Sequence, residues 1–461
     1  MKPKTNPKHA ILLTIISIIL LNSALIAQGH SHGYRPGELT CKMVPGYSIG
    51  IIITNYGTTV KGHQPQTGCY LLSIPAGQDA ESLAVVIDAR PDVEYCTVNH
   101  LLAAPEPFQR SQPFLDVECV GDIYAQTSAA TLELVDAHEF STGANVRVAV
   151  VDGGVNFDHP LFAGVPGTVI SGWDYIDGDA DAYDESGGNC FGHGTFVAGI
   201  VHMTAPDTKI YSYRVLDTTG QGSAYDISEA IIQAIADSCR VINLSMGMIG
   251  VDPALDDALR LAVRNNVLIV AAAGNDSTDL SATFPFPASR ASCMAIAALD
   301  SVNLKADFSN YGEKIDLCAP GTGIYSAFPD TIYAWWDGTS FAAPFVVGTA
   351  ALMISLDPAI TRDDVFSILQ QTAVNVDDIN PDYGGLLGAG LVNVPAALGF
   401  IGSVIHGDPN GDGTIDLLDI LYLIDFLYED GPVPVPMNAA EVNDDGLINL
   451  LDILLLIDNI Y

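Results

Sequence analysis

Between about residue 120 and residue 398, short runs of β-branched and other apolar residues alternate with longer stretches of helical pattern. The runs are VRVAVV (146–151), KIYSYRV (209–215), RVINLS (240–245) and VLIVAAA (267–273), and helical stretches at 224–237 and 253–266 separate them. Continuous apolar strands that alternate with helices are typical of a parallel sheet buried on both faces. The pattern therefore predicts an α/β fold with helices on both faces of one sheet. Ligand sites in such sheets gather at the carboxyl ends of the strands.

Three short segments each carry a reactive side chain where this sheet would present it. AVVDGGV (149–155) places Asp152 at a strand end, GHGTFVAG (192–199) places His193 at the start of a small-residue helix, and GTSFAAP (338–344) places Ser340 at the start of an apolar helix. A serine hydroxyl needs a neighbouring imidazole to remove its proton, and that imidazole needs an acceptor on its other nitrogen. We therefore expect Ser340 as nucleophile, His193 as general base and Asp152 as the orienting carboxylate.

A fourth segment, AAAGND (271–276), ends a buried strand with Gly274 and Asn275. The Asn275 amide can donate a hydrogen bond to a developing oxyanion, beside the backbone N–H of Ser340 at its helix N-terminus. Taken singly, a GxS motif, a buried histidine, a turn aspartate and a turn asparagine are usually structural. That alternative loses force when all four occur together.

The four segments resemble the subtilisin family of serine proteases, whose order of catalytic residues is also Asp, His, Ser. The resemblance extends from about 120 to 398 and includes VLDTTGQGSAYDISEAI (215–231), VINLSMG (241–247) and the closing GAGLVNVPAAL (388–398). It implies a secreted serine endopeptidase that works through an acyl-enzyme and needs no cofactor for catalysis. It also implies a subtilisin-like catalytic domain over residues 115–400.

The resemblance places the substrate-binding residues in three segments. Two backbone segments are expected to hold an extended peptide by β-pairing, and a small-residue wall is expected to leave room for a sizeable apolar side chain. The residues are Gly220, Gly222, Ser245, Met246, Gly247, Ala272 and Gly274. The chain departs from the family pattern at Gly153, Phe196, Phe341 and Phe345, none of which removes a proton-transfer group.

Two segments precede the catalytic domain. Lysines at 2, 4 and 8, an apolar run over 10–21 and small residues at 24 and 27 predict a signal peptide over 1–27, the alternative being an uncleaved anchor. Residues 28–110 contain strand-like runs, SIGIIIT (48–54) and CYLLSIPAG (69–77), and a helix candidate, ESLAVVIDA (81–89). They resemble a subtilisin-type propeptide, which assists folding and blocks the active site, although an ordinary α+β domain that stays attached is the alternative. APEPFQRSQP (104–113) is interpreted as a linker.

The eight cysteines allow disulfides in an exported protein, but their spacing does not give the pairing. Cys239 and Cys293 lie in apolar segments and are expected to be buried free thiols. Cys41, Cys69 and Cys96 make an odd number in the propeptide-like segment. We hypothesise that one of them forms a bridge to Cys119, just beyond the linker.

The last segment, 405–461, contains a duplication in which DPNGDGTIDLLDILYLID (408–425) recurs as EVNDDGLINLLDILLLID (441–458). Each copy begins with oxygen-bearing residues at the spacing of a calcium loop. The expected ligands are Asp408, Asn410, Asp412, Thr414, Asp416 and Asp419 in the first copy, and Glu441, Asn443, Asp445, Leu447, Asn449 and Asp452 in the second, with Thr414 and Leu447 supplying backbone carbonyls.

Aspartate at the twelfth position and one helix after each loop resemble a type I dockerin, a small all-α calcium-binding domain. The resemblance implies a cohesin-bearing scaffold or cell-surface protein as partner, with Leu417, Leu418, Leu450 and Leu451 in the recognition positions. Glu441 departs from the family pattern, so weaker binding is expected at the second site. The alternative is a calcium-stabilised terminal domain without a partner.

The net charge of −37 disfavours nucleic acid as a partner, and no apolar run after the signal reaches membrane-spanning length. The acidic run over 174–185 is expected to be a solvated loop, with a further calcium site as the alternative. The sequence thus predicts a secreted endopeptidase tethered through a calcium-dependent dockerin. The competing function is a non-catalytic or self-inhibited binding protein on a subtilisin scaffold.

Overall fold

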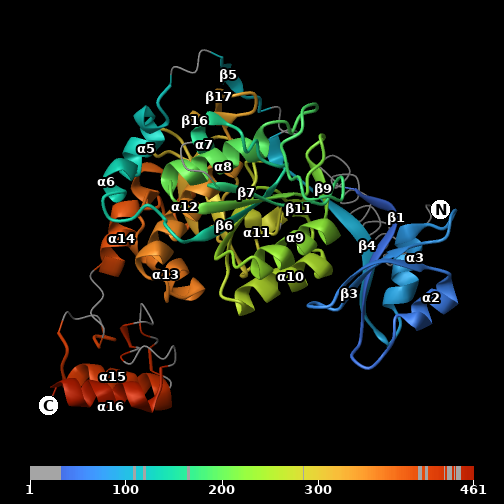
Figure 1. The fold of residues 1–461 in the computed structure, drawn as a ribbon. Helices are drawn as coiled ribbons and strands as arrows, with labels where there is room; N and C mark the ends of the chain where they lie inside the picture. The colour runs from blue at the N-terminus through green and yellow to red at the C-terminus, as the bar shows by residue number, and fades with distance from the viewer. Residues whose placement is uncertain are drawn as a thin grey trace, which may run out of the picture.

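The computed structural model describes residues 33–106, 111–117, 121–163, 167–283, 285–402, 407–410, 414–429, 431–432, 434, 439–440, 442 and 448–460. The predicted signal peptide lies outside these residues. Three parts follow one another along the chain: an N-terminal α+β unit, a large α/β unit and a pair of C-terminal helices (Figure 1).

The α/β unit is built around a seven-stranded sheet in the order β15-β14-β12-β10-β6-β8-β7, and every neighbouring pair in it is parallel. Its strands are β6 Arg147–Asp152, β7 Val169–Asp174, β8 Lys209–Arg214, β10 Val241–Leu244, β12 Leu268–Ala272, β14 Cys293–Leu299 and β15 Leu317–Pro320. All residues of β10, β12 and β14 are buried. This burial is why the central strands appear in the sequence as continuous apolar runs, and it confirms the predicted fold class.

Two pairs of helices pack against the sheet. The first pair is α8 (His193–Thr204) with α12 (Thr339–Leu356), and the second is α9 (Ala224–Ala236) with α10 (Pro253–Arg264). Figure 1 shows α8 above the strands and α9 and α10 below them. The expectation that no apolar run after the signal reaches membrane-spanning length is wrong for α12, which alone among the described helices is long and apolar enough to span a bilayer. It is almost entirely buried in the core.

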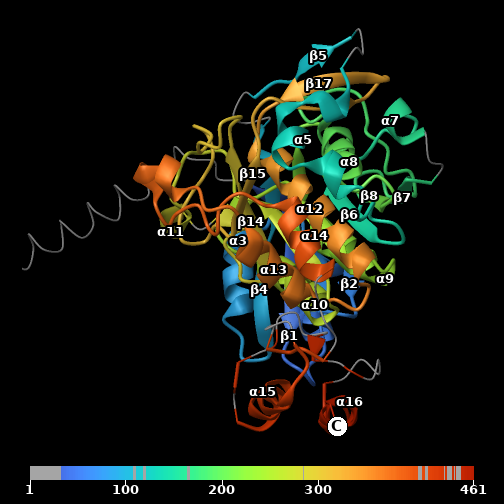
Figure 2. The ribbon, with the colours of Figure 1, turned by 90° about the vertical axis from the view of Figure 1, so that its left-hand side faces the viewer.

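Smaller elements complete this unit. The strands are β5 Phe114–Asp116, β9 Gln221–Ser223, β11 Met248–Ile249, β13 Pro285–Phe286, β16 Ile324–Phe328 and β17 Ile332–Trp336. The helices are α5 Thr127–Thr131, α6 Leu134–Ala137, α7 Pro160–Ala163, α11 Leu280–Thr283, α13 Arg362–Thr372 and α14 Val394–Gly402, with 3₁₀ turns η1 Ile123–Ala125, η2 Asp377–Ile379 and η3 Pro381–Tyr383. In Figure 2, α13 and α14 lie near α12.

The N-terminal unit folds two helices against an antiparallel sheet. Its elements are β1 Tyr34–Met43, α2 Gly50–Tyr56, β2 Thr59–Gln64, β3 Cys69–Ser73, α3 Ala80–Asp88 and β4 Val93–Ala103. The sheet order is β2-β3-β1-β4-β9, so β9 of the α/β unit extends the N-terminal sheet. A disulfide joins Cys41 and Cys96, which face each other in the β1–β4 ladder.

The SIGIIIT run was predicted as a strand, and this prediction is wrong because residues 50–56 form helix α2. Ile52 is fully buried in the core of the N-terminal unit, and Gly57 ends the helix in the left-handed region at φ 68°. Isoleucine is enriched in strands, but this preference depends on context, and packing against a core overrides it here. The other runs behave as predicted, with CYLLS in β3 and the ESLAVVIDA stretch in α3.

The predicted linker is also corrected in its first part. Strand β4 continues to Ala103, and Ala104 donates its backbone N–H to Gly220 of the α/β unit, at 3.0 Å. Residues 104–106 therefore lie along the α/β unit and are not a free spacer. Residues 107–110 lie outside the described part of the chain.

The C-terminal helices α15 (Leu417–Tyr428) and α16 (Leu450–Ile460) lie side by side (Figures 1 and 2). They share a small apolar core of Ile420, Leu423, Ala440, Ile453 and Leu456. Each helix is the second half of one sequence copy, so the duplication in the sequence is also a duplication in the fold.

Candidate active site

The three predicted catalytic residues come from three elements that meet at one edge of the sheet. Asp152 is the last residue of β6, His193 is the first residue of α8, and Ser340 is the second residue of α12. All three are fully buried. Gly192 precedes His193 at φ 87°, and a Cβ there would lie 2.2 Å from the Phe328 ring. Only glycine fits this turn into the helix.

Asp152 and His193 are in direct contact. His193 Nδ1 lies 2.8 Å from Asp152 Oδ1, which also accepts the backbone N–H of Gly153 at 2.7 Å. A carboxylate on Nδ1 fixes the orientation of the ring and turns Nε2 toward the opposite side. There, Nε2 lies 3.1 Å from Glu106 Oε2.

Glu106 occupies the centre of the site, although it was not among the residues predicted from the sequence. Ser340 Oγ donates to Glu106 Oε2 at 2.9 Å, and Asn275 Nδ2 donates to Glu106 Oε1 at 2.9 Å. Within the described residues, no hydrogen bond joins Ser340 Oγ to His193 Nε2, because both groups contact the same carboxylate oxygen. An acidic residue inside a proline-containing stretch gives no signal of such a position, since the same composition is typical of a solvated linker.

The pKa of His193 depends on both carboxylates. Burial lowers this pKa, but Asp152 and Glu106 outweigh burial and raise it to about 10. With Glu106 in place, the imidazole is therefore protonated at neutral pH.

The Asn275 side chain is held by its own oxygen, which accepts the backbone N–H of Thr339 at 3.0 Å and the Thr339 hydroxyl at 2.8 Å. Its Nδ2 therefore points to the space beside Ser340.

Three of the seven predicted substrate-binding residues, Gly220, Gly222 and Gly247, pair with the chain's own segment 101–104. Leu102 pairs with Gly222 of β9, Ala103 exchanges two backbone hydrogen bonds with Gly247 (2.9 and 3.0 Å), and Ala104 binds Gly220. The remaining predicted residues are Ser245, whose Oγ donates to the Ser340 carbonyl, Met246 and Ala272, which are buried, and Gly274, whose N–H donates to Thr339 Oγ1.

The departures from the family pattern have local explanations. Phe196 and Phe341 pack together with ring centroids 4.6 Å apart, and Trp336 and the His193 ring pack against the same cluster. At Gly153, a Cβ would lie 3.3 Å from the Cys190 sulfur, so the thiol occupies the space of a larger side chain. Phe345 is fully buried in the core.

Asp184 is a second site residue that was not predicted from the sequence. Its buried carboxylate accepts the Thr195 hydroxyl at 2.5 Å, the Thr195 N–H at 3.4 Å and the Gly192 N–H at 3.1 Å. Burial raises the pKa of Asp184 to about 7, although these hydrogen bonds lower it. Asp184 therefore caps the first turn of α8 and positions His193.

The acidic run before His193 surrounds an arginine. Arg214 Nη1 contacts Asp174 and Asp177 at 2.6 Å each, and Arg214 Nη2 contacts Glu185 at 2.9 Å. The guanidinium thus compensates the charge of three carboxylates that could otherwise be read as a metal site.

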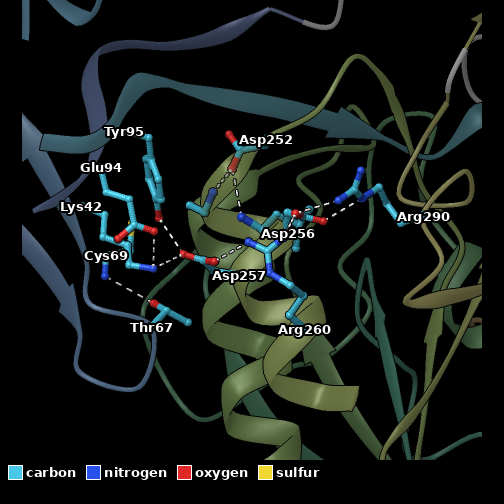
Figure 3. Close-up of polar contacts among 12 residues, drawn as sticks. Lys42, Thr67, Cys69, Glu94, Tyr95, Asp252, Asp256, Asp257, Arg260 and Arg290 are labelled. Atoms are coloured by element: carbon cyan, nitrogen blue, oxygen red, sulfur yellow. Dashed lines mark hydrogen bonds and ion pairs between the residues drawn. The ribbon is translucent and has the colours of Figure 1, made fainter. Parts of the chain in front are cut away.

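The N-terminal unit contacts α10 through charged side chains. Figure 3 shows Lys42 and Tyr95 pointing toward Asp257 on the first turns of α10; Lys42 Nζ lies 2.8 Å from Asp257 Oδ2. His100 also contacts Asp252, the residue that caps α10, at 2.8 Å. Asp256 in turn binds Arg260 and Arg290 (Figure 3).

The cysteines agree in part with the predictions. Cys239 and Cys293 are buried free thiols, as expected, and Cys69, Cys190 and Cys318 are also buried and unbonded. Because Cys41 and Cys96 bond to each other, Cys69 is the remaining candidate for a bridge to Cys119. Cys119 lies outside the described residues.

The two C-terminal loops share one arrangement. Asp419 Oδ2 accepts the N–H of Asp416 at 2.8 Å, and Asp452 Oδ2 accepts the N–H of Asn449 at 2.8 Å. Position 12 of each copy thus binds the backbone of position 9, and both aspartates are fully buried. Asp408, Asn410 and Thr414 are described. The other expected ligands, Asp412, Glu441, Asn443, Asp445 and Leu447, lie outside the described residues.

Comparisons with known proteins follow the same division of the chain. Residues 143–390 match the Subtilase family, and residues 406–461 match the Dockerin type I domain. Subtilisin amylosacchariticus from Bacillus subtilis subsp. amylosacchariticus is 35% identical over 266 residues, 56% of this chain and 66% of the relative. This match thus spans slightly less than two thirds of that relative's length. Subtilisin from Bacillus pumilus is 35% identical over 56% of this chain and 92% of the relative.

Solved structures are similar over a larger part of the fold. One is fervidolysin from Fervidobacterium pennivorans, a keratinolytic enzyme related to subtilisin, with a TM-score of 0.67 at 22% identity. The match covers 81% of this chain and 62% of the fervidolysin chain. At that identity the similarity shows the fold alone. A lanthipeptide protease has a TM-score of 0.55 at 27% identity, with 62% of this chain and 96% of its own covered.

Proposed function

Because this chain belongs to the subtilase family, we propose that it is a subtilisin-type serine endopeptidase with Ser340 as nucleophile. The observation that carries the proposal is the convergence of three groups on one carboxylate: the Ser340 hydroxyl, the His193 ring and the Asn275 amide. Asp152 lies directly behind His193. A reacting peptide carbonyl placed where that carboxylate lies would meet a nucleophile, a base and an oxyanion donor.

The proposed reaction is acyl transfer. Once His193 is neutral, it accepts the Ser340 proton while Oγ bonds to the peptide carbonyl carbon, and Asn275 donates to the developing oxyanion. The resulting imidazolium, held by Asp152, then protonates the leaving amine as the C–N bond breaks. Water attacks the acyl-enzyme with the same proton transfers, which release the acid and restore Ser340.

Substrates are proposed to bind as extended peptides between Gly220–Gly222 and Ser245–Gly247. Segment 101–104 supports this, since it occupies these backbone partners in antiparallel pairing. Ala272 and Gly274 are proposed to border the pocket beside the scissile bond and to leave space for an apolar side chain. A peptide series with strict preference for a basic residue at that position would contradict this pocket.

A fluorophosphonate probe tests the enzyme proposal, because it bonds covalently only to an activated serine. We expect labelling of the processed wild-type protein and no labelling of Ser340→Ala, with the same contrast in hydrolysis of a chromogenic peptide. Equal labelling of the two proteins, or none of the processed wild type, would favour the competing function of a binding protein on a subtilisin scaffold.

The terminal segments are proposed to determine maturation and location. Residues 1–27 would direct export, and residues 28–110 would act as a propeptide, so that the mature protein is extracellular. The C-terminal repeats are proposed to bind Ca²⁺ and to tether the enzyme to a cohesin-bearing scaffold or cell-surface protein. Support comes from buried carboxylates at equivalent positions in both copies and from the exposed leucines 417, 418, 450 and 451.

The donor set fits calcium chemically. Asp408, Asp419 and Asp452 offer hard carboxylate oxygens from side chains that are at most 6% exposed. Buried carboxylates are costly without a compensating cation or hydrogen bonds, and Ca²⁺ prefers such oxygens. When bound, the ion would neutralise these charges and hold the loops against α15 and α16.

A further inference from the structure

The end of β4 and the residues that follow it approach the site like an extended peptide, and the chain then changes direction. Leu101, Leu102 and Ala103 pair with β9 in antiparallel register, and Ala103 and Ala104 bind Gly247 and Gly220. Residues 105 and 106 are helical. Pro105 has no N–H to donate to the flanking backbone, so the β-pairing ends there.

This turn brings a side chain, and not a peptide bond, to the reactive centre. Glu106 is fully buried, and its two carboxylate oxygens accept from Ser340 and Asn275 and contact His193. The carboxylate also packs closely over the backbone ahead of α12, because a Cβ on Gly338 would lie 2.1 Å from Glu106 Oε1. The carboxylate therefore fills the space that a scissile carbonyl needs.

These contacts direct the Ser340 proton toward Glu106 and away from the expected base, His193. For catalysis, the Ser340 proton has to pass to His193 Nε2, but here Ser340 donates it toward Glu106. His193 faces carboxylates on both nitrogens, Asp152 from β6 and Glu106 from the segment after β4. Cys190 and Asp184 lie in the loop before α8. The thiol is neutral because burial and the surrounding carboxylates raise its pKa, and Asp184 bonds to Gly192 and Thr195.

We propose that the Glu106 side chain is an internal ligand of the active site that keeps the intact chain inactive, and that activation begins when this carboxylate leaves. The inference rests on the proposed protease function and names the side chain that would block its active site before processing. Backbone pairing of residues 101–104 alone would hold the segment as a substrate is held. The carboxylate makes the segment an inhibitor, because it excludes a peptide bond and stabilises the protonated imidazole.

The pH dependence follows from the same contacts. With two carboxylates beside it, His193 has its pKa raised to about 10, so the ring of the intact chain becomes neutral only as pH rises through that value. Removal of the Glu106 charge leaves one carboxylate partner, so the pKa falls. Activity of the intact chain should then appear at a lower pH.

The test uses full-length protein and initial rates of fluorophosphonate labelling, with intact and processed bands separated by electrophoresis. Glu106→Ala removes the ligand, and Glu106→Gln keeps its shape while removing its charge. Glu81→Gln, an exposed position in the first turn of α3, is the matched control. Each protein is also prepared with Ser340→Ala, so that processing by the chain's own site can be recognised.

We expect the intact band of Glu106→Ala to label at least about tenfold faster than wild type at pH 7, since one charge-assisted hydrogen bond accounts for that factor. Glu106→Gln should move the pH midpoint of labelling below that of wild type, and Glu81→Gln should match wild type. If a Glu106 variant loses its intact band faster than wild type, and Ser340→Ala abolishes this loss, the result also supports the inhibitory role of Glu106.

Two negative outcomes are distinguishable. If the processed bands label but intact Glu106→Ala and Glu106→Gln label no faster than wild type, the inhibitory role of Glu106 is wrong and the protease proposal stands. If no band of any variant labels, including the processed wild type, both proposals fail together.

Discussion

At the scale of single residues, the buried Asp184 carboxylate makes a pH-dependent contribution to stability. Burial raises its pKa from 3.8 to about 7 in the folded protein, despite hydrogen bonds from Thr195 and Gly192 that lower it. The folded state therefore binds this proton more tightly than the unfolded chain does. Between about pH 4 and pH 7, the contribution of Asp184 to the free energy of unfolding therefore decreases as pH rises.

We expect Asp184→Asn to remove this titration. In a Ser340→Ala background, which prevents self-digestion, its free energy of unfolding should change less between pH 5 and pH 8 than that of the parent. The difference should be at least about 1.4 kcal/mol, the value of one pKa unit. Denaturant unfolding at both pH values measures it, with the exposed Asp181→Asn in the same loop as control. Equal pH dependence in all three proteins would contradict the prediction.

The residues proposed to take part in the reaction were easier to predict than the residues proposed to act through them. Asp152, His193, Ser340 and Asn275 were singled out because each lies in a short motif at a strand end or helix start, and the structure brings all four together. Glu106 and Asp184 lie in stretches with turn-like or acidic composition. Their roles depend on where long loops run, which local sequence does not encode.

At the scale of elements, charge pairs join the N-terminal unit to α10. Lys42 is largely buried between Glu94 of its own unit and Asp257 of the helix (Figure 3). Removing one partner of such a pair leaves a carboxylate with poorer compensation, although Arg260 still contacts Asp257. The N-terminal unit should then bind less tightly after its cleavage.

We expect Lys42→Met to increase labelling of the processed complex about tenfold, the effect of losing one charge-assisted contact. Its labelling should also depend less on salt than that of wild type, since one screened ion pair is gone. Lys61→Met is the control, because Lys61 pairs with Glu38 inside the N-terminal unit. Equal labelling of the two variants would show that the Lys42 contact does not hold the complex.

Element prediction succeeded where one physical signal dominated. The buried strands and amphipathic helices of the α/β unit have a consistent period, so their order and parallel arrangement follow from the sequence. The prediction for the run at 48–54 failed because its four isoleucines are compatible with a strand and with a short helix. The core position of Ile52 selects the helix, and the sequence does not contain that information locally.

At the scale of the whole molecule, the net charge of −37 favours the binding of cations, and the acidic loops of the C-terminal repeats are the sites where we expect it. In both copies, the carboxylate at position 12 is buried and holds the backbone of position 9. Without a cation, the neighbouring acidic side chains repel one another and oppose closure of the loops. The leucines at the start of α15 and α16 are exposed and follow these loops directly, so we expect their relative positions to depend on loop closure.

Removal of calcium is therefore expected to abolish tethering. Full-length Ser340→Ala should take up Ca²⁺ in calorimetric titration and should be retained by an immobilised type I cohesin in calcium but not in chelator. Asp408→Ala should reduce calcium uptake and retention at least about tenfold, the effect of losing a charged ligand contact. Asp425→Ala, on α15 and outside the expected ligands, should not reduce them.

Retention in chelator equal to that in calcium would contradict a calcium-dependent dockerin. Calcium uptake without retention by any cohesin would instead favour a calcium-stabilised terminal domain, because the ion would then support the fold and not a partner.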